Sequence, residues 1–173
     1  MAIFGVAACA TNSTAPPVAS SPAVKHVELS RAKSYDSLAQ LAKESTVIAR
    51  VSATNTTSIE TAAGLQFTVT TVTVEKSFRG TKSGALLRVR QVGGPTTDVA
   101  GEVPAALTAG RDYLLFMSVF RDGTEPTDQY VITGDAGVFE ANSSGTFDRS
   151  DPLSTNLPSK LGENDVQTAS TGT

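Results

Sequence analysis

The residue types that carry out most nucleophilic and acid–base catalysis are scarce in this chain. Its 173 residues include one histidine, His26, and one cysteine, Cys9. No cluster of carboxylates lies near His26 in the sequence, so we expect it to be an exposed linker residue rather than a zinc ligand. A Ser–His–Asp triad or a Cys–His pair needs a histidine beside the nucleophile. We therefore expect no enzymatic activity, no cofactor and no metal site, with a carboxylate-only active site as the remaining catalytic alternative.

Two groups of carboxylates have spacings that could serve an acid–base pair or a calcium ion. The first comprises Asp98 and Glu102, and the second comprises Asp122, Glu125 and Asp128. The second group lacks the alternating ligand positions and the closing glutamate of a calcium-binding loop. We interpret it as the solvated tip of a hairpin.

Two arginines alternate along one strand-like run, Leu86 to Val92. Arg88 and Arg90 are two positions apart, so both side chains point to the same face of a sheet. Together with Gln91 and the loop 93–102 that follows, they are the predicted ligand-binding residues. The alternative is that the two arginines belong to a solvated outer face.

The N-terminal segment is apolar and ends in small residues directly before the cysteine. Val6, Ala7, Ala8 and Cys9 resemble the lipobox of bacterial lipoproteins, so residues 1–9 are interpreted as a partial lipoprotein signal. The resemblance implies a lipid on Cys9, the membrane as a partner through that anchor, and a location on the extracytoplasmic face of the cell membrane or in secreted form. The alternative is a free cysteine at the N-terminus.

Composition excludes some partners. The formal net charge is −3 and charged residues make up 18% of the chain. This leaves no basic field to hold a phosphate backbone, so nucleic acid is not expected as a partner. No stretch approaches the roughly 20 apolar residues of a membrane span.

The chain is expected to contain one domain, at about 35–149, between two polar segments. Residues 10–34 are rich in Pro, Ser, Thr and Ala and predict a flexible linker, although Val27 and Leu29 could begin a short edge strand. Residues 150–173 are polar and aperiodic and predict a disordered tail. Within the domain, the apolar stripe of Tyr35 to Ser45 predicts a helix, capped by Ser34 or Asp36.

Alternation and turn residues predict a series of short strands after the helix. We expect polar loops at 55–64 and 96–104. The run Leu65 to Ser77 changes the parity of its apolar face near Thr70 and Thr71, which indicates a β-bulge or sharp bend. Turn-rich segments separate strands predicted at Val47–Ala53, Leu65–Ser77, Leu86–Val92, Tyr113–Phe120, Gln129–Thr133, Val138–Glu140 and Thr146–Asp148.

The order of these features resembles the OB-fold-type barrel of netrin-like and metalloproteinase-inhibitor-like domains. The resemblance covers about Tyr35 to Phe139. The features that carry it are the helix, the strand at Val47–Val51, the run Phe67 to Phe78 followed by Arg79-Gly80, the run Leu87 to Gly94, and Leu107 with the run Gly110 to Phe116. It implies a mainly β fold, namely a small antiparallel OB-like barrel or sandwich with one N-terminal helix.

The function that follows from these observations is a non-catalytic extracytoplasmic lipoprotein domain. It is expected to act as a binding or scaffold module at the cell envelope, for a protein, peptide or glycan. The alternative implied by the inhibitor-like resemblance is an inhibitor or modulator of an extracellular hydrolase. The inhibitory mechanism of that family uses disulfides and a free N-terminal cysteine amine, and the one-cysteine chain does not match this pattern.

Overall fold

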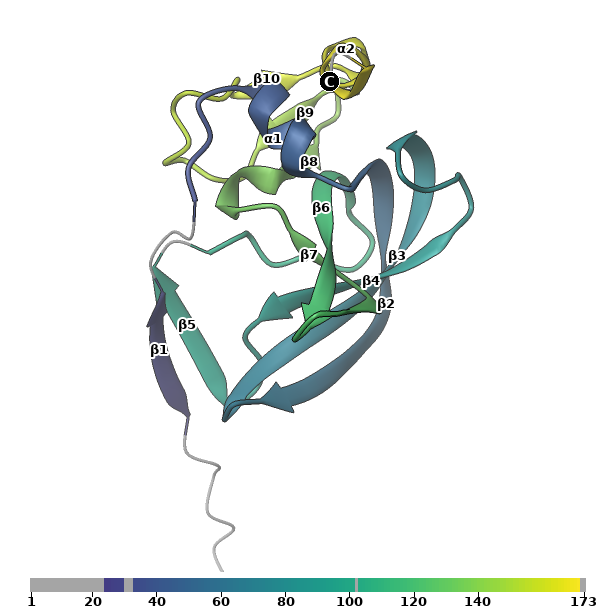
Figure 1. Ribbon diagram of the computed structural model, residues 1–173. Coiled ribbons are helices and arrows are strands. Elements are labelled where there is room, and N and C mark those ends of the chain that lie inside the picture. The colour runs from purple at the N-terminus through teal and green to yellow at the C-terminus, as the bar shows by residue number, and fades with distance from the viewer. Residues whose placement is uncertain (1–23, 30–32, 102, 172–173) are drawn as a thin grey trace, which may run out of the picture.

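The computed structural model describes residues 24–29, 33–101 and 103–171 (Figure 1). The chain is mainly β, in agreement with the sequence prediction. Cys9 and residues 10–23 of the predicted linker lie outside the described part, as does Glu102. In chain order the elements are β1 (Lys25–Leu29), α1 (Leu38–Glu44), β2 (Val47–Ala62), β3 (Leu65–Arg79), β4 (Leu86–Val92), β5 (Thr97–Gly101), β6 (Asp112–Asp122), β7 (Glu125–Ile132), the 3₁₀ turn η1 (Asp135–Gly137), β8 (Val138–Ala141), β9 (Phe147–Arg149), β10 (Lys160–Leu161) and α2 (Glu163–Thr171).

Part of the main sheet closes on itself. The eight-stranded sheet has the order β10-β9-β8-β6-β2-β3-β4-β7, and β6 also pairs with β7. Pairing therefore runs from β6 through β2, β3, β4 and β7 and back to β6. Every pair in this ring is antiparallel except β4 with β7, which is parallel. A ring of this kind protects strand edges that an open sheet would expose.

The ring encloses one hydrophobic core, which we call the ring core. Strand alternation supplies it: Val47, Ala49 and Val51 of β2 point inward, as do Leu87 and Val89 of β4. The other faces of these strands point away from the ring core. The side chains of Arg88 and Arg90 are thereby directed to the opposite side of β4 from Leu87 and Val89.

The predicted bend in the long strand β3 is present. Val69 and Thr70 are both 2% exposed although they are consecutive, so the buried face changes parity there. The pairing of β2 with β3 jumps from Ala53–Val72 to Thr57–Thr70, which places the extra residues on β2, opposite Thr71. The position of the irregularity was thus predicted correctly, and the bulged strand is the neighbour.

The predicted loop at 55–64 is wrong, because β2 continues to Ala62. Residues Thr57 to Ala62 pair with β3, and this pairing satisfies the backbone groups of a Thr-rich segment that has high β propensity. A tight turn at Ala63 and Gly64, both with positive φ, then leads into β3. The extension matters for function because it brings Glu60 onto the sheet.

Helix α1 is shorter than predicted and has a different cap. Ser37, rather than Ser34 or Asp36, accepts a hydrogen bond from the Gln40 amide at 3.2 Å. At the other end, the Ser45 hydroxyl donates to the Leu41 carbonyl at 2.8 Å. Leu41 itself is fully buried on the outer side of the ring.

The C-terminal segment is folded, which corrects the prediction of a disordered tail at 150–173. Its apolar residues are few, but Leu157, Leu161 and Val166 are each at most 3% exposed. They join α1, β6, β8 and β9 in a second core, which we call the helix core. Strand β10 pairs with β9. In Figure 1, α1 and α2 lie together at one end of the molecule, away from β1 and β5.

A separate two-stranded sheet contains β1 and β5. The two strands run parallel, with Lys25 opposite Thr97 and Leu29 opposite Gly101. The short edge strand predicted from Val27 and Leu29 is therefore present. The long loop predicted at 96–104 is wrong for residues 97–101, and the linker prediction is wrong for 25–29, because each segment supplies the other's backbone partners.

Candidate functional site

The strongest candidate site centres on Arg90, on the face of β4 that points away from the ring core. The Arg90 side chain is only 7% exposed, although nothing in its own strand would neutralise it. The alternative interpretation of Arg88 and Arg90 as a solvated outer face therefore does not hold for Arg90. A buried guanidinium needs compensation for the hydration it has lost.

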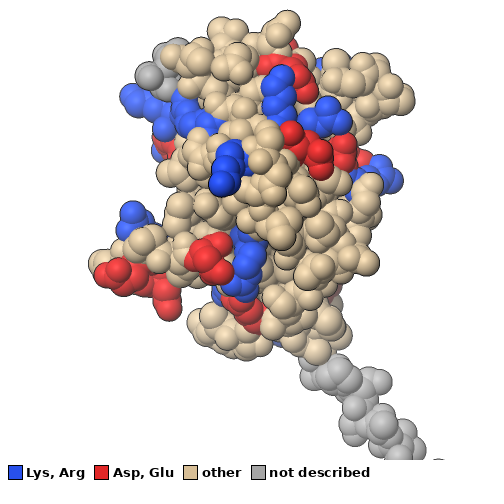
Figure 2. All heavy atoms as spheres, turned by 90° about the vertical axis from the view of Figure 1, so that its right-hand side faces the viewer, with Lys and Arg blue, Asp and Glu red and all other residues tan. Residues whose placement is uncertain are grey.

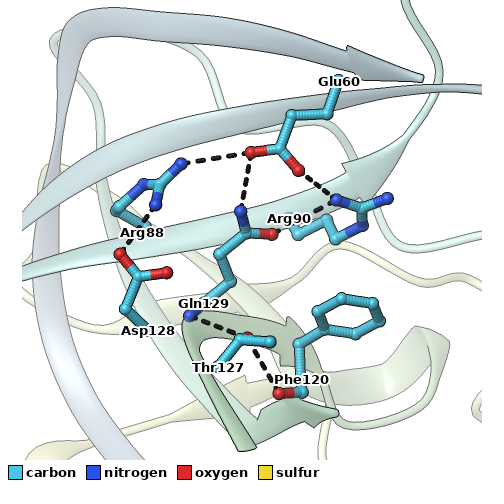
Figure 3. Close-up of polar contacts among 7 residues, drawn as sticks. All are labelled: Glu60, Arg88, Arg90, Phe120, Thr127, Asp128 and Gln129. Carbon is cyan, nitrogen blue, oxygen red and sulfur yellow. Dashed lines mark hydrogen bonds and ion pairs between the residues drawn. The ribbon is translucent and has the colours of Figure 1, made fainter. Parts of the chain in front are cut away.

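Side chains from two other strands, β2 and β7, supply that compensation (Figure 3). The Glu60 carboxylate at the end of β2 pairs with Arg90 Nη1 through Oε2 and with Arg88 Nη2 through Oε1, the latter at 3.1 Å. The Gln129 amide on β7 donates to Glu60 Oε1 at 2.7 Å and accepts from Arg90 Nη1 at 3.3 Å. We call Glu60, Arg88, Arg90 and Gln129 the Arg90 cluster.

The outer side of the Arg90 cluster is less protected. Arg88 Nη1 donates to Asp128 Oδ2 at 2.7 Å, and this contact raises the pKa of the Arg88 guanidinium above its ordinary value. The side chain of Asp128 is 70% exposed, so solvent screens its charge. Glu60, whose side chain is 32% exposed, is thus the less solvent-exposed of these two carboxylates and is shared between two arginines.

Two aromatic rings hold the Arg90 guanidinium. Its central carbon lies 3.9 Å from the ring centroid of Phe67 on β3 and 4.7 Å from that of Phe120 on β6. Both distances are well within the range of a favourable cation–π contact. Phe120 is itself fixed through its backbone, whose carbonyl accepts from Thr127 Oγ1 at 2.9 Å. The side chain of Arg90 is therefore held in one orientation.

One edge of this guanidinium makes no hydrogen bond to the part of the chain that the structure describes. Both hydrogen bonds of Arg90 leave from Nη1, and the buried Nε has no partner among the described residues. In Figure 3, the two remaining nitrogens of Arg90 lie on the side away from Glu60 and Gln129. Nε and Nη2 form the edge with which arginine binds a carboxylate through two parallel hydrogen bonds. A buried donor left unsatisfied costs about 1–3 kcal/mol, so an acceptor bound at Nε would offset that cost.

A small cavity lies beside Arg90. Its volume is about 190 Å³, and apart from Arg90 and Gln91 its wall is formed by apolar side chains. They are Phe67, Val92, Pro104, Phe120, Val131 and Ile132. A mostly apolar cavity with one convergent charged group has the composition of a ligand site, although it is smaller than the 300–1,000 Å³ typical of drug-sized ligands.

Gln91 has a different role from the two arginines. Its amide nitrogen donates to the Ala105 carbonyl at 2.8 Å, and its oxygen accepts from the Leu107 amide at 3.1 Å. These bonds fix the segment that carries Pro104 against β4. Of the three residues predicted to bind a ligand, the structure brings Arg90 and Gln91 to the cavity and leaves Arg88 in the polar network next to it.

The other chemistry-bearing residues lie elsewhere. His26 is on β1, where its Nδ1 lies 3.0 Å from Asp98 Oδ2, and both side chains are largely exposed. Asp122 and Glu125 are paired at the exposed turn of the β6–β7 hairpin, as predicted for a hairpin tip. Within the described residues, no group of three or more His, Cys, Asp or Glu side chains is arranged to hold a metal ion.

Charge is spread thinly over the surface. On the face that Figure 2 shows, positive and negative side chains lie next to one another, separated by wide uncharged areas. In the described part of the chain, no helix is long and apolar enough to cross a membrane.

Sequence reasoning missed the partners that define this site. Glu60 fell in a predicted loop, and Phe67, Phe120 and Gln129 were interpreted as ordinary strand residues. One signal was present: two arginines on a strand between apolar residues need carboxylate partners if their face is covered. The sequence alone does not say which carboxylate is near.

Comparison of the chain with protein-family models, with curated proteins and with solved structures finds no match. The functional conclusion therefore rests on the geometry.

Proposed function

We propose that this chain is a non-catalytic binding module of the cell envelope and that the cavity beside Arg90 is its binding site. The observation that carries the proposal is the buried Arg90, whose Nε faces no acceptor of the described chain while a cavity lies next to it. Proteins rarely leave such a donor unsatisfied, and functional sites are where the exceptions gather. A ligand that accepts from this edge relieves the cost and gains affinity from it.

The barrel belongs to the OB type in this proposal. The supporting observation is the pairing order β2-β3-β4-β7-β6 with one parallel pair, β4 with β7. OB barrels bind ligands on the face of their second and third strands and at the loops between the first and second and between the fourth and fifth. In this chain the second and third ring strands are β3 and β4, which contribute Phe67 and Arg90.

A lipid on Cys9 would carry the module on the extracytoplasmic face of the membrane, or the module is released in secreted form. The resemblance of Val6-Ala7-Ala8-Cys9 to a lipobox supports the anchor. The full chain, made in a bacterium grown with an alkyne fatty acid, should take up the label at Cys9. A Cys9→Ser variant that is labelled as strongly as the native chain contradicts the anchor.

A photo-crosslinker tests the binding site in the cell envelope. We expect a photoreactive phenylalanine at exposed Ala105, beside the cavity, to capture one discrete partner on irradiation. The matched control carries the same group at Leu153, which is exposed on the C-terminal segment that packs with the helix end of the molecule. Equal capture from both positions, or none from Ala105, contradicts the proposal. A captured hydrolase whose activity falls on binding would identify the module as a modulator of that enzyme.

A further inference from the structure

The edge of Arg90 that Glu60 and Gln129 leave free belongs to a residue of the cavity wall and is suited to a charged acceptor. Nη1 is already engaged by Glu60 and Gln129, which leaves Nε and Nη2 as a two-donor edge. A carboxylate matches the spacing of that edge with two parallel, charge-assisted hydrogen bonds, whereas a carbonyl oxygen is a single neutral acceptor. The donor set therefore favours a carboxylate.

The local charge agrees with this preference. Glu60 is divided between Arg88 and Arg90, and the second carboxylate of the network, Asp128, is 70% exposed and contacts Arg88 only. Arg90, whose own side chain is 7% exposed, is therefore only partly neutralised by the carboxylates of the cluster. Electrostatic attraction to a buried charge is stronger than to a charge at the surface. An anion entering the cavity gains from this residual positive charge.

The cavity also limits the size and polarity of what accompanies the carboxylate. Its volume of about 190 Å³ is below the range typical of drug-sized ligands, which favours a small group such as one amino-acid residue. Phe120, Val131 and Pro104 give it apolar walls. An apolar side chain next to a carboxylate satisfies both halves of the site.

We infer that the cavity binds the C-terminal residue of a peptide, with its carboxylate on Arg90 Nε and Nη2 and its apolar side chain against Phe120 and Val131. This inference rests on the proposed binding function and names its ligand class. The carboxylate stays ionised on binding, and no covalent bond is made or broken.

Nuclear magnetic resonance of the full chain tests the inference at the atom concerned. N-acetyl-leucine serves as the probe, and the side-chain Nε–H resonance of Arg90 is the readout. We expect a saturable shift of that resonance. N-acetyl-leucinamide, which lacks the charge, should bind about 10- to 100-fold more weakly, since a hydrogen bond to a charged group contributes about 1.5–3 kcal/mol. N-acetylglycine, which lacks the apolar side chain, should also bind more weakly.

Two variants separate binding from folding. Val92→Phe fills the cavity from its wall and leaves Arg90 in place, so it should abolish the shift while the rest of the spectrum stays folded. Arg121→Lys is the matched control, because Arg121 donates to the Thr124 carbonyl at the exposed hairpin and does not line the cavity. Binding by this control should equal that of the native chain.

The inference is overturned if N-acetyl-leucinamide binds as tightly as N-acetyl-leucine, or if N-acetyl-leucine leaves the Arg90 resonance unmoved. Capture of a partner from Ala105 by photo-crosslinking, together with either result, keeps the binding module and discards the carboxylate. If neither a crosslink from Ala105 nor a shift of the Arg90 resonance is observed, the proposed function itself is contradicted.

Discussion

At the scale of single residues, the central feature is a buried arginine whose partners come from distant parts of the chain. Arg90 pairs with Glu60, which is 30 residues away, and with Gln129, which is 39 residues away. Each partner removes part of the cost of burying the charge, and the two aromatic rings cover its faces. Removing one partner would leave the remaining charges of the Arg90 cluster buried without full compensation.

We predict that Glu60→Gln lowers the free energy of unfolding by about 1–3 kcal/mol, because it leaves two arginines without their shared carboxylate. Denaturation in urea measures the change. Asp128→Asn is the control: its carboxylate is mostly exposed and should contribute less than about 1 kcal/mol. Equal effects of the two substitutions contradict the special position of Glu60.

Tyr35 provides a pH-dependent test at the same scale. Burial, followed by the nearby Glu44 carboxylate, raises the pKa of the Tyr35 hydroxyl to about 12. The unfolded chain loses this proton near pH 10, so the folded state binds more protons between pH 10 and 12. The contribution of protonated Tyr35 to the free energy of unfolding is therefore fully present below pH 10. It falls by about 2 kcal/mol as the pH rises to 12.

Tyr35→Phe should not show this loss, because phenylalanine has no proton to release. The measurement is the free energy of unfolding of both proteins from pH 9 to 12, and the difference between the two curves isolates Tyr35 from the lysines that titrate in the same range. Parallel curves would show that Tyr35 ionises equally in both states.

At the scale of elements, the C-terminal segment completes the fold. Leu161 is 1% exposed and lies in the helix core, directly before α2. We predict that Leu161→Ala lowers the free energy of unfolding by about 2–4 kcal/mol through lost burial and the cavity it leaves. Leu153→Ala, at a leucine that is 55% exposed, should change it by less than about 0.5 kcal/mol. Similar changes in the free energy of unfolding for the two substitutions would mean that the C-terminal segment does not pack in the helix core.

Elements were predictable where their own pattern was strong. The run at Tyr113–Phe120 is apolar on both faces and is the most buried strand, and the parity change near Thr70 located the bend. The C-terminal elements were not predicted, because the apolar residues of this segment are too few to form a periodic pattern. They are Leu157, Leu161 and Val166. Their burial depends on α1 and β9, which are far away in the chain. Strand β5 was not predicted for the same reason, because its pairing partner β1 is also far away in the chain.

At the scale of the whole molecule, closure of the ring creates the site. The sequence indicated Arg88 and Arg90 by their alternation, but Glu60, Phe120 and Gln129 reach them only because β2, β6 and β7 return to the sheet around β4. Long-range pairing of this kind is specified by the whole fold rather than by local propensity. The two arginines were therefore predictable, and their partners and the cavity were not.

The most direct measurement of the central claim is a high-resolution crystal structure of the full chain grown with N-acetyl-leucine. The account predicts that both carboxylate oxygens lie within hydrogen-bond distance of Arg90 Nε and Nη2, that the leucine side chain lies between Phe120 and Val131, and that Glu60 remains on Nη1. A structure in which Nε donates to an oxygen of the chain itself, or in which Phe120 fills the cavity, contradicts the account.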